Sequence, residues 1–172
     1  MKKILFSLIA LMAVMTVQAQ SICASWRSMQ PVVETEEDGS FSAQNLTYTF
    51  YEDGTYTFVN ELTMATQPAP TMAVEIATNI ELKGTYVLEG DKLTLTPNMD
   101  TYKPELLSTS LNGRVADDPT VKANVNSMIN SDMFKSQFAE VLESTVKITD
   151  SMLEMNDGEH VVNFMKFATI KN

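Results

Sequence analysis

The sequence predicts a mainly β protein of antiparallel strands, with two short helices inserted before the last strands. Three observations lead to this fold class. Apolar and polar side chains alternate through residues 46–96, the turn sequences in this stretch keep the alternation in register, and residues 119–143 change to a helical period. A period of two is typical of strands that bury one face, whereas apolar residues at i, i+3 and i+4 indicate an amphipathic helix.

The alternation assigns the even-numbered positions to the buried face. Threonine, glutamate and lysine occupy most odd positions, which we therefore expect to face solvent. Asn60 and Thr78 are polar residues on the buried parity, where they would need polar partners or a ligand. The apolar even positions are Leu46, Tyr48, Phe50, Tyr56, Phe58, Leu62, Met64, Met72, Val74, Ile76, Ile80, Leu82, Tyr86 and Leu88.

Two hairpin turns can be tested against this alternation. A two-residue loop at Asp53-Gly54 would pair Phe50 with Thr57 and mix aromatic rings with threonines on one face. A three-residue loop with Gly54 in the left-handed region keeps the aromatic rings together, so we predict that loop. It pairs Phe50 with Tyr56 and Tyr48 with Phe58, and a two-residue loop at Gly90-Asp91 pairs Leu88 with Leu93 and Tyr86 with Leu95.

A long strand is predicted from Met72 to Leu88, with a bend where Gly84 falls on the buried parity. A long bent strand that serves two neighbours is what a closing barrel or an orthogonal sandwich needs. Residues 65–71 are expected to form a loop before it. Ile22 to Val33 is predicted as a first strand containing Trp26, and residues 34–40 as an acidic turn whose oxygens lack the regular spacing of a calcium loop.

The helical segment begins at Asp118-Pro119, which predicts an N-cap followed by proline at the first helical position. Its two apolar stripes would lie more than about 120° apart on one straight helix. We therefore predict two short helices within residues 119–143, broken at Asn130-Ser131, that pack against the sheet or across one barrel mouth. The stripes are Val121, Val125, Met128 and Ile129, then Phe134, Phe138, Val141 and Leu142. Residues 97–115 are expected to be irregular, with a short strand near 106–111.

Strands resume at Thr145. A turn at Asp150-Ser151 pairs Val146 with Met155 and places Lys147 opposite Glu154. After a turn at residues 156–158, the last strand runs from His160 to about Ile170. It is apolar on both faces, which predicts that one of the helices covers its outer face.

The first residues predict an export signal. Lys2 and Lys3 precede an apolar run from Ile4 to Val14, and Val17-Gln18-Ala19 is a small-residue cleavage signal. We expect residues 1–19 to be removed near Ala19-Gln20, leaving residues 20–172 as one domain of a secreted or periplasmic protein without a transmembrane segment. This mature chain has 10 basic and 22 acidic residues, a net charge of about −12 that opposes binding to nucleic acid.

Short motifs resemble those of a known family. Tyr48 to Phe58 follows the pattern Tyr-x-Phe-x-x-Asp-Gly-Thr-Tyr-x-Phe, and Gly84-Thr85-Tyr86 leads into residues 90–95, Gly-Asp-Lys-Leu-Thr-Leu. With a Trp near the mature N-terminus, these motifs resemble the lipocalin-like domains of many secreted proteins of Gram-negative bacteria. The resemblance implies an up-and-down β-barrel of about eight strands. Lipocalins begin Gly-x-Trp and pack an arginine of the last strand on that Trp. This chain keeps Trp26 without the Gly and offers only Lys166 and Lys171.

The sequence gives little support for catalysis or metal binding. His160 is the sole histidine and Cys23 the sole cysteine, so a strong zinc site and an intramolecular disulfide are not expected. No serine lies in a nucleophile motif. We therefore predict a protein that is not an enzyme and has no cofactor or metal.

Two function classes remain. The first is a binding module that holds a small apolar or amphipathic ligand inside the barrel. The second is a secreted or envelope structural or interaction module with a filled core and no ligand; a partner protein is unknown. The candidate lining residues are Trp26, Tyr48, Phe50, Tyr56, Phe58, Asn60, Tyr86 and Leu88.

Overall fold

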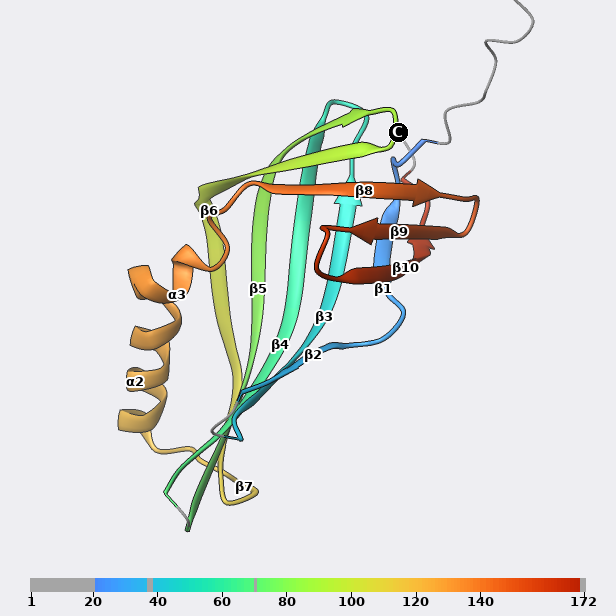
Figure 1. Cartoon of the computed structure of the whole chain (residues 1–172). Helices are drawn as coiled ribbons and strands as arrows, with labels where there is room; N and C mark the ends of the chain where they lie inside the picture. Colours follow the sequence, from blue (N-terminus) through green and yellow to red (C-terminus); the bar gives the residue numbers. More distant parts are fainter. Residues whose placement is uncertain (1–20, 37–38, 70, 171–172) are drawn as a thin grey trace, which may run out of the picture.

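The computed structural model describes residues 21–36, 39–69 and 71–170, and the predicted export signal lies outside them. Most of the described residues lie in strands, and two short helices precede the last three strands (Figure 1). The elements are β1 (Ser25–Ser28), β2 (Val32–Thr35), β3 (Phe41–Phe50), β4 (Thr55–Ala69), β5 (Met72–Glu89), β6 (Lys92–Leu111), β7 (Arg114–Val115), α2 (Pro119–Ile129), α3 (Asp132–Ser136), β8 (Leu142–Ile148), β9 (Met152–Asn156) and β10 (Val161–Ala168).

The strands form one antiparallel sheet that closes in a ring. β1 is the closing element, because it pairs with β10 on one side and with β3 on the other. The order around the ring is β1, β3, β4, β5, β6, β8, β9 and β10, so neighbours in the sheet follow one another along the chain. β2 and β7 pair only with β3 and β6. The predicted antiparallel β architecture is confirmed at this level.

Both predicted hairpin registers are confirmed. Phe50 pairs with Tyr56 and Tyr48 with Phe58 across a three-residue loop, in which Gly54 has a φ of 80°. Across the next turn, Leu88 pairs with Leu93 and Tyr86 with Leu95. The third predicted register is also present: Val146 pairs with Met155, and the Lys147 ammonium lies 2.6 Å from a Glu154 carboxylate oxygen.

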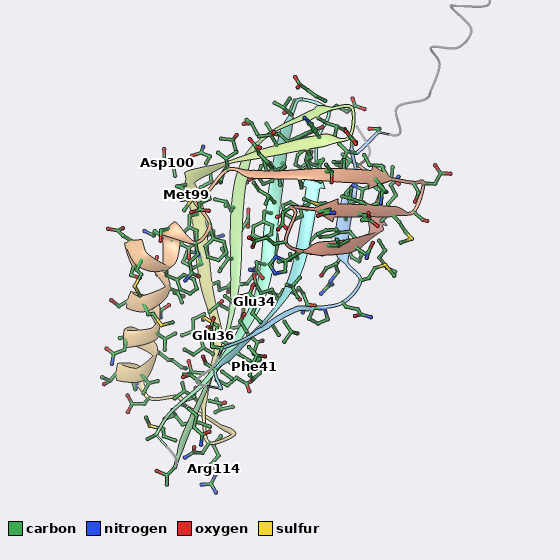
Figure 2. The ribbon with its side chains drawn as sticks, in the orientation of Figure 1. Glu34, Glu36, Phe41, Met99, Asp100 and Arg114 are labelled. Carbon is green, nitrogen blue, oxygen red and sulfur yellow. The ribbon has the colours of Figure 1, made fainter. Side chains whose placement is uncertain are left out.

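Gly84 lies where β5 and β6 turn a corner, as the sequence predicts. A Cβ atom on Gly84 would lie 2.3 Å from the Thr96 carbonyl oxygen and 2.6 Å from the Tyr56 ring. In Figure 1, the first part of β6 runs beside β8, and the strand then turns downward beside the long part of β5. The outer corner carries Met99 and Asp100 (Figure 2). There the pairing of β6 with β5 jumps from Asn98, opposite Lys83, to Lys103, opposite Glu81.

The expectation that residues 97–115 are irregular is wrong, because β6 continues to Leu111. Pro97 and Pro104 interrupted the sequence pattern, since proline lacks the N–H that a central strand needs. β6 pairs with β8 only through Lys92–Leu95. Beyond Leu95, much of this edge of β6 has no hydrogen-bonded partner strand, so both prolines can be accommodated there. The predicted loop 65–71 is likewise too long, because β4 reaches Ala69 and β5 begins at Met72.

The predicted first strand from Ile22 to Val33 is in fact two strands. β1 ends at Ser28, and β2 begins at Val32 after a break that contains Pro31. β1 closes the ring between β10 and β3, whereas β2 pairs only with the first half of β3. The break allows the chain to leave the ring and run along its opening. The acidic turn after β2 includes residues 37–38, which lie outside the described residues.

The two predicted short helices and the Asp118 N-cap are confirmed, but the second helix is shorter than predicted. It ends at Ser136, and Leu142 begins β8 instead of continuing the helical stripe. The Asp118 carboxylate accepts hydrogen bonds from the Thr120 and Val121 N–H groups, and the Ser131 hydroxyl accepts one from the Phe134 N–H. α2 and α3 lie beside β6 in Figure 1. Their buried residues Val125, Ile129 and Phe134 pack with Leu62, Ile76 and Ile80 of the sheet. Neither helix of the described part has the length and apolarity that crossing a membrane would require.

The outer face of the last strand contradicts the prediction that a helix covers it. Val161, Met165 and Phe167 are exposed, while Phe164 on the opposite face is buried in the core. The helices lie on the other side of the molecule (Figure 1), where α2 packs against β6. The apolar residues on both faces of β10 therefore reflect one buried face and one exposed apolar face.

Candidate functional site

A pocket of about 390 Å³ opens at the mouth of the strand ring. Its walls come from β2, from the connection between α3 and β8, and from the turn between β9 and β10. These segments are distant in sequence, and the closure of the sheet brings them together. The residues that line it are Val32, Glu34, Gln44, Leu46, Tyr48, Tyr56, Phe58, Leu82, Leu95, Pro97, Gln137, Phe138, Glu140, Val141, Leu142, Asp157, His160 and Val162.

The floor of the pocket is aromatic. Tyr48, Tyr56 and Phe58 belong to the β3–β4 hairpin, whose register places their rings on the inner face. The ring centroid of Tyr48 lies 4.8 Å from that of Phe58 and 6.1 Å from that of Tyr56. These separations are typical of packed aromatic pairs, so the floor is a rigid apolar surface.

Two hydroxyl groups on this floor lack partners. Tyr48 is only 8% exposed and Tyr56 only 4%, yet within the described part of the chain neither hydroxyl forms a hydrogen bond. Neither hydroxyl oxygen is among the enclosed atoms that lack a partner, so both oxygens remain open to the pocket. A polar group in such a position normally binds water or a ligand. Both side chains line the pocket, so a molecule inside it could supply the missing partner.

Burial keeps both of these tyrosines neutral. Desolvation raises the pKa of Tyr56 to about 12. Desolvation also raises the pKa of Tyr48 well above its ordinary value, and the proximity of Tyr56 adds to this effect. Each hydroxyl can therefore donate one hydrogen bond and accept others at neutral pH.

Asn60 and Thr78 lie deeper, on the face that the helices cover. The Asn60 side-chain amide donates to the Gln44 side-chain oxygen at 2.9 Å, and Gln44 lines the pocket. Asn60 Oδ1 and Thr78 Oγ1 are buried without a hydrogen-bond partner among the described residues. Neither residue lines the pocket itself, so Asn60 reaches it only through Gln44.

The other candidate lining residues lie outside this pocket. Phe50 is fully buried, with its ring stacked 5.8 Å from Tyr48 and edge-on 5.1 Å from Tyr86. The Tyr86 hydroxyl donates to the Tyr51 carbonyl at 2.8 Å and lies 3.4 Å from the Cys23 sulfur. Trp26 is fully buried beside Tyr48, and Leu88 packs at the margin of the same core.

The rim of the pocket is polar and was not identified from the sequence. It carries the side chains of Glu34, Gln137, Glu140, Asp157 and His160. Glu34 lies on β2, below the strands β8–β10 in the view of Figure 2. The other four residues lie in turns and connections, so no periodic signal in the sequence places them beside Glu34.

Asp157 is the rim residue with the best-defined environment. Its carboxylate accepts hydrogen bonds from the His160 N–H at 2.7 Å and the Glu159 N–H at 2.9 Å. These bonds, first of all that from His160, lower the pKa of Asp157 below its ordinary value. His160 Nδ1 lies 3.8 Å from the other carboxylate oxygen. Asp157 is therefore ionised at neutral pH.

The described residues contain no group of three or more His, Cys, Asp or Glu side chains that could hold a metal ion. Cys23 is a free thiol. No family model matches this chain, and a search of curated proteins finds no similar sequence.

Proposed function

We propose that this chain is an exported, lipocalin-like binding protein that holds a small apolar or amphipathic ligand in the pocket at the mouth of its strand ring. The family resemblance of the hairpin motifs supports this proposal. So does the closed antiparallel ring, in which β1, carrying Trp26, pairs with the last strand. The Lys166 ammonium over the Trp26 ring offers a cation where lipocalins place an arginine.

The observation that carries the proposal is the pair of unpartnered tyrosine hydroxyls on an aromatic floor. The hydroxyls of Tyr48 and Tyr56 have no hydrogen-bond partner among the described residues, and both side chains line the pocket, where a bound molecule would pair with them. A volume of about 390 Å³ falls within the range of about 300–1,000 Å³ found for small-molecule sites. Apolar walls with a few convergent polar groups are also the usual composition of such sites.

The alternative function is a secreted or envelope interaction module with a filled interior. One observation favours it: Phe50 packs against Tyr48, Tyr56 and Tyr86, and such ring pairs stabilise a core without a ligand by about 0.5–1.5 kcal/mol each. This packing lies beside the pocket rather than inside it.

Two measurements test the proposal. Native mass spectrometry of the protein purified from its own cells should find a small molecule bound to the chain. Calorimetric titration with octanol, a neutral amphipathic probe, should give saturable binding that Tyr48→Phe weakens by about three- to tenfold, since the variant loses one hydrogen bond. If nothing co-purifies, and neither octanol nor a charged octyl compound binds below about 100 μM, the filled-core alternative is correct.

A further inference from the structure

The charges around the pocket are all of one sign, apart from a histidine. Glu34, Glu140 and Asp157 lie on its rim, and no lysine or arginine is among the lining residues. The three belong to β2, the α3–β8 connection and the β9–β10 turn, so the carboxylates surround the opening from different segments. An anionic ligand would have to enter past all of them.

Two of these carboxylates have no counter-charge among the described residues. Among the described residues, the ion pairs of Arg27 with Glu61, Lys122 with Asp117 and Lys147 with Glu154 all lie away from the pocket. Glu34 and Glu140 form no ion pair with any residue in the described part of the chain. Asp157 is partly compensated by backbone N–H groups and by the neighbouring His160. The whole chain, with a formal charge of −10, adds to the negative potential of the opening.

The floor of the pocket also favours a positively charged ligand. The hydroxyls of Tyr48 and Tyr56 face the pocket and are neutral, so their oxygens can accept hydrogen bonds from an ammonium group. Aromatic faces also attract cations. A carboxylate or phosphate bound at the same depth would lose water without meeting a cationic side chain, which is costly.

We propose that the pocket selects amphipathic amines and rejects fatty acids and other anionic amphiphiles. An amphipathic amine has an apolar body and a positively charged nitrogen. This inference rests on the proposed binding function and specifies its ligand class. The apolar body packs on wall residues such as Leu46, Leu95 and Phe138. The nitrogen lies between the tyrosine hydroxyls and the rim carboxylates.

The test compares three octyl probes that differ only in the head group: octylamine, octanol and octanoate. At neutral pH and low salt, calorimetry should give the tightest binding for octylamine and the weakest for octanoate, with a difference of roughly tenfold or more from two exposed carboxylates. Added salt should reduce this preference, because the rim is exposed to solvent.

A matched pair of double variants assigns the preference to the rim. Glu34→Gln with Glu140→Gln should bring octylamine and octanoate to within about threefold of each other and leave octanol binding unchanged. Glu75→Gln with Glu105→Gln changes the net charge equally at exposed positions outside the pocket and should keep the preference.

The outcomes separate the two proposals. If octanol binds but octanoate binds as tightly as octylamine, the amine selectivity is overturned and the binding function stands. The amine selectivity of the rim is likewise overturned if both double variants reduce the preference equally, because net charge rather than the rim then explains it. If none of the three probes binds, the proposed binding function itself is overturned.

Discussion

The Lys166 ammonium lies 5.3 Å from the centroid of the Trp26 ring, and the two residues face each other in the register of β10 and β1. The Trp26 indole N–H donates to the Ile22 carbonyl at 2.7 Å, so the ring is held at its edge as well as over its face. Because β1 closes the ring of strands, this pair stabilises the seam between the first and last strands of the sheet.

Replacing Lys166 by methionine should therefore destabilise the fold. The variant keeps an apolar stem over Trp26 but loses the cation, and we expect a loss of about 0.5–2 kcal/mol in the free energy of unfolding. Urea denaturation followed by Trp26 fluorescence measures it. Lys103→Met, at an exposed position of β6, is the control and should change the stability by less than about 0.5 kcal/mol. Equal effects of the two substitutions would contradict a specific role for the Trp26 contact.

Phe50 should be among the most sensitive core positions. Its side chain is fully buried among aromatic rings, and Phe50→Ala should cost about 3–5 kcal/mol. Phe167→Ala provides the contrast, because Phe167 on the outer face of β10 is 68% exposed, and its loss should cost less than about 0.5 kcal/mol. Denaturant titration of both variants decides whether the assigned inner and outer faces are correct; a loss below about 1 kcal/mol for Phe50→Ala would reverse them.

The hairpin registers were predictable because they depend on local information. The parity of Tyr48, Phe50, Tyr56 and Phe58, together with a glycine at the left-handed position, leaves one loop length that keeps the aromatic rings on one face. The caps of α2 and α3 are local in the same sense, since Asp118 and Ser131 bind N–H groups two or three residues away.

The pocket was not predictable, because it depends on closure of the sheet. Glu34, Glu140 and Asp157 come from three separate segments and lie on no common periodic face. The continuous β6 was missed for a related reason: the two prolines it contains are tolerated only because the opposite edge of the strand lacks a partner there, and pairing is a tertiary property.

The hydroxyls of Tyr86 and Tyr48 differ in whether they have a hydrogen-bond partner within the described part of the chain, and this difference should appear in the free energy of unfolding. The Tyr86 hydroxyl donates to the Tyr51 carbonyl, so Tyr86→Phe should cost about 1–2 kcal/mol. Tyr48→Phe removes a hydroxyl that has no partner in the described residues, so the ligand-free protein should lose less than about 0.5 kcal/mol or gain stability. Urea denaturation of the two variants, stripped of any bound molecule, compares them directly. A larger loss for Tyr48→Phe than for Tyr86→Phe would mean that the Tyr48 hydroxyl is already satisfied.

Gly84 should not tolerate a side chain. A Cβ atom would collide with the Thr96 carbonyl and with the Tyr56 ring that forms part of the pocket floor. Gly84→Ala should therefore destabilise the protein by about 1–3 kcal/mol and also weaken octanol binding, because Tyr56 must move. Thr85→Ala, at the neighbouring exposed position, should leave binding unchanged. Normal octanol affinity in a folded Gly84→Ala variant would show that the Tyr56 ring is not part of the binding surface.

Acid should weaken the fold partly through Asp157. Its pKa in the folded protein lies below the ordinary value of 3.8, chiefly because of the hydrogen bond from the His160 N–H, with that from Glu159 and the nearby imidazole adding to it. A carboxyl group whose pKa is lower in the folded protein than in the unfolded chain stabilises the folded state. This stabilisation is fully present when the pH is above the pKa of the unfolded chain, and it is lost as the pH falls through the pKa of the folded protein. Asp157→Asn removes the titrating group while keeping an oxygen acceptor at the turn.

The free energy of unfolding of the wild type should therefore exceed that of Asp157→Asn at neutral pH, and the two should converge as the pH falls below 3.8. Urea denaturation of both proteins from about pH 7 to about pH 2.5 measures the difference. Asp53, Asp117 and Asp118 also have lowered pKa values and contribute to acid unfolding of both proteins. They cancel in the comparison, so a difference that stays constant across this range would contradict the assigned role of the Asp157 carboxylate.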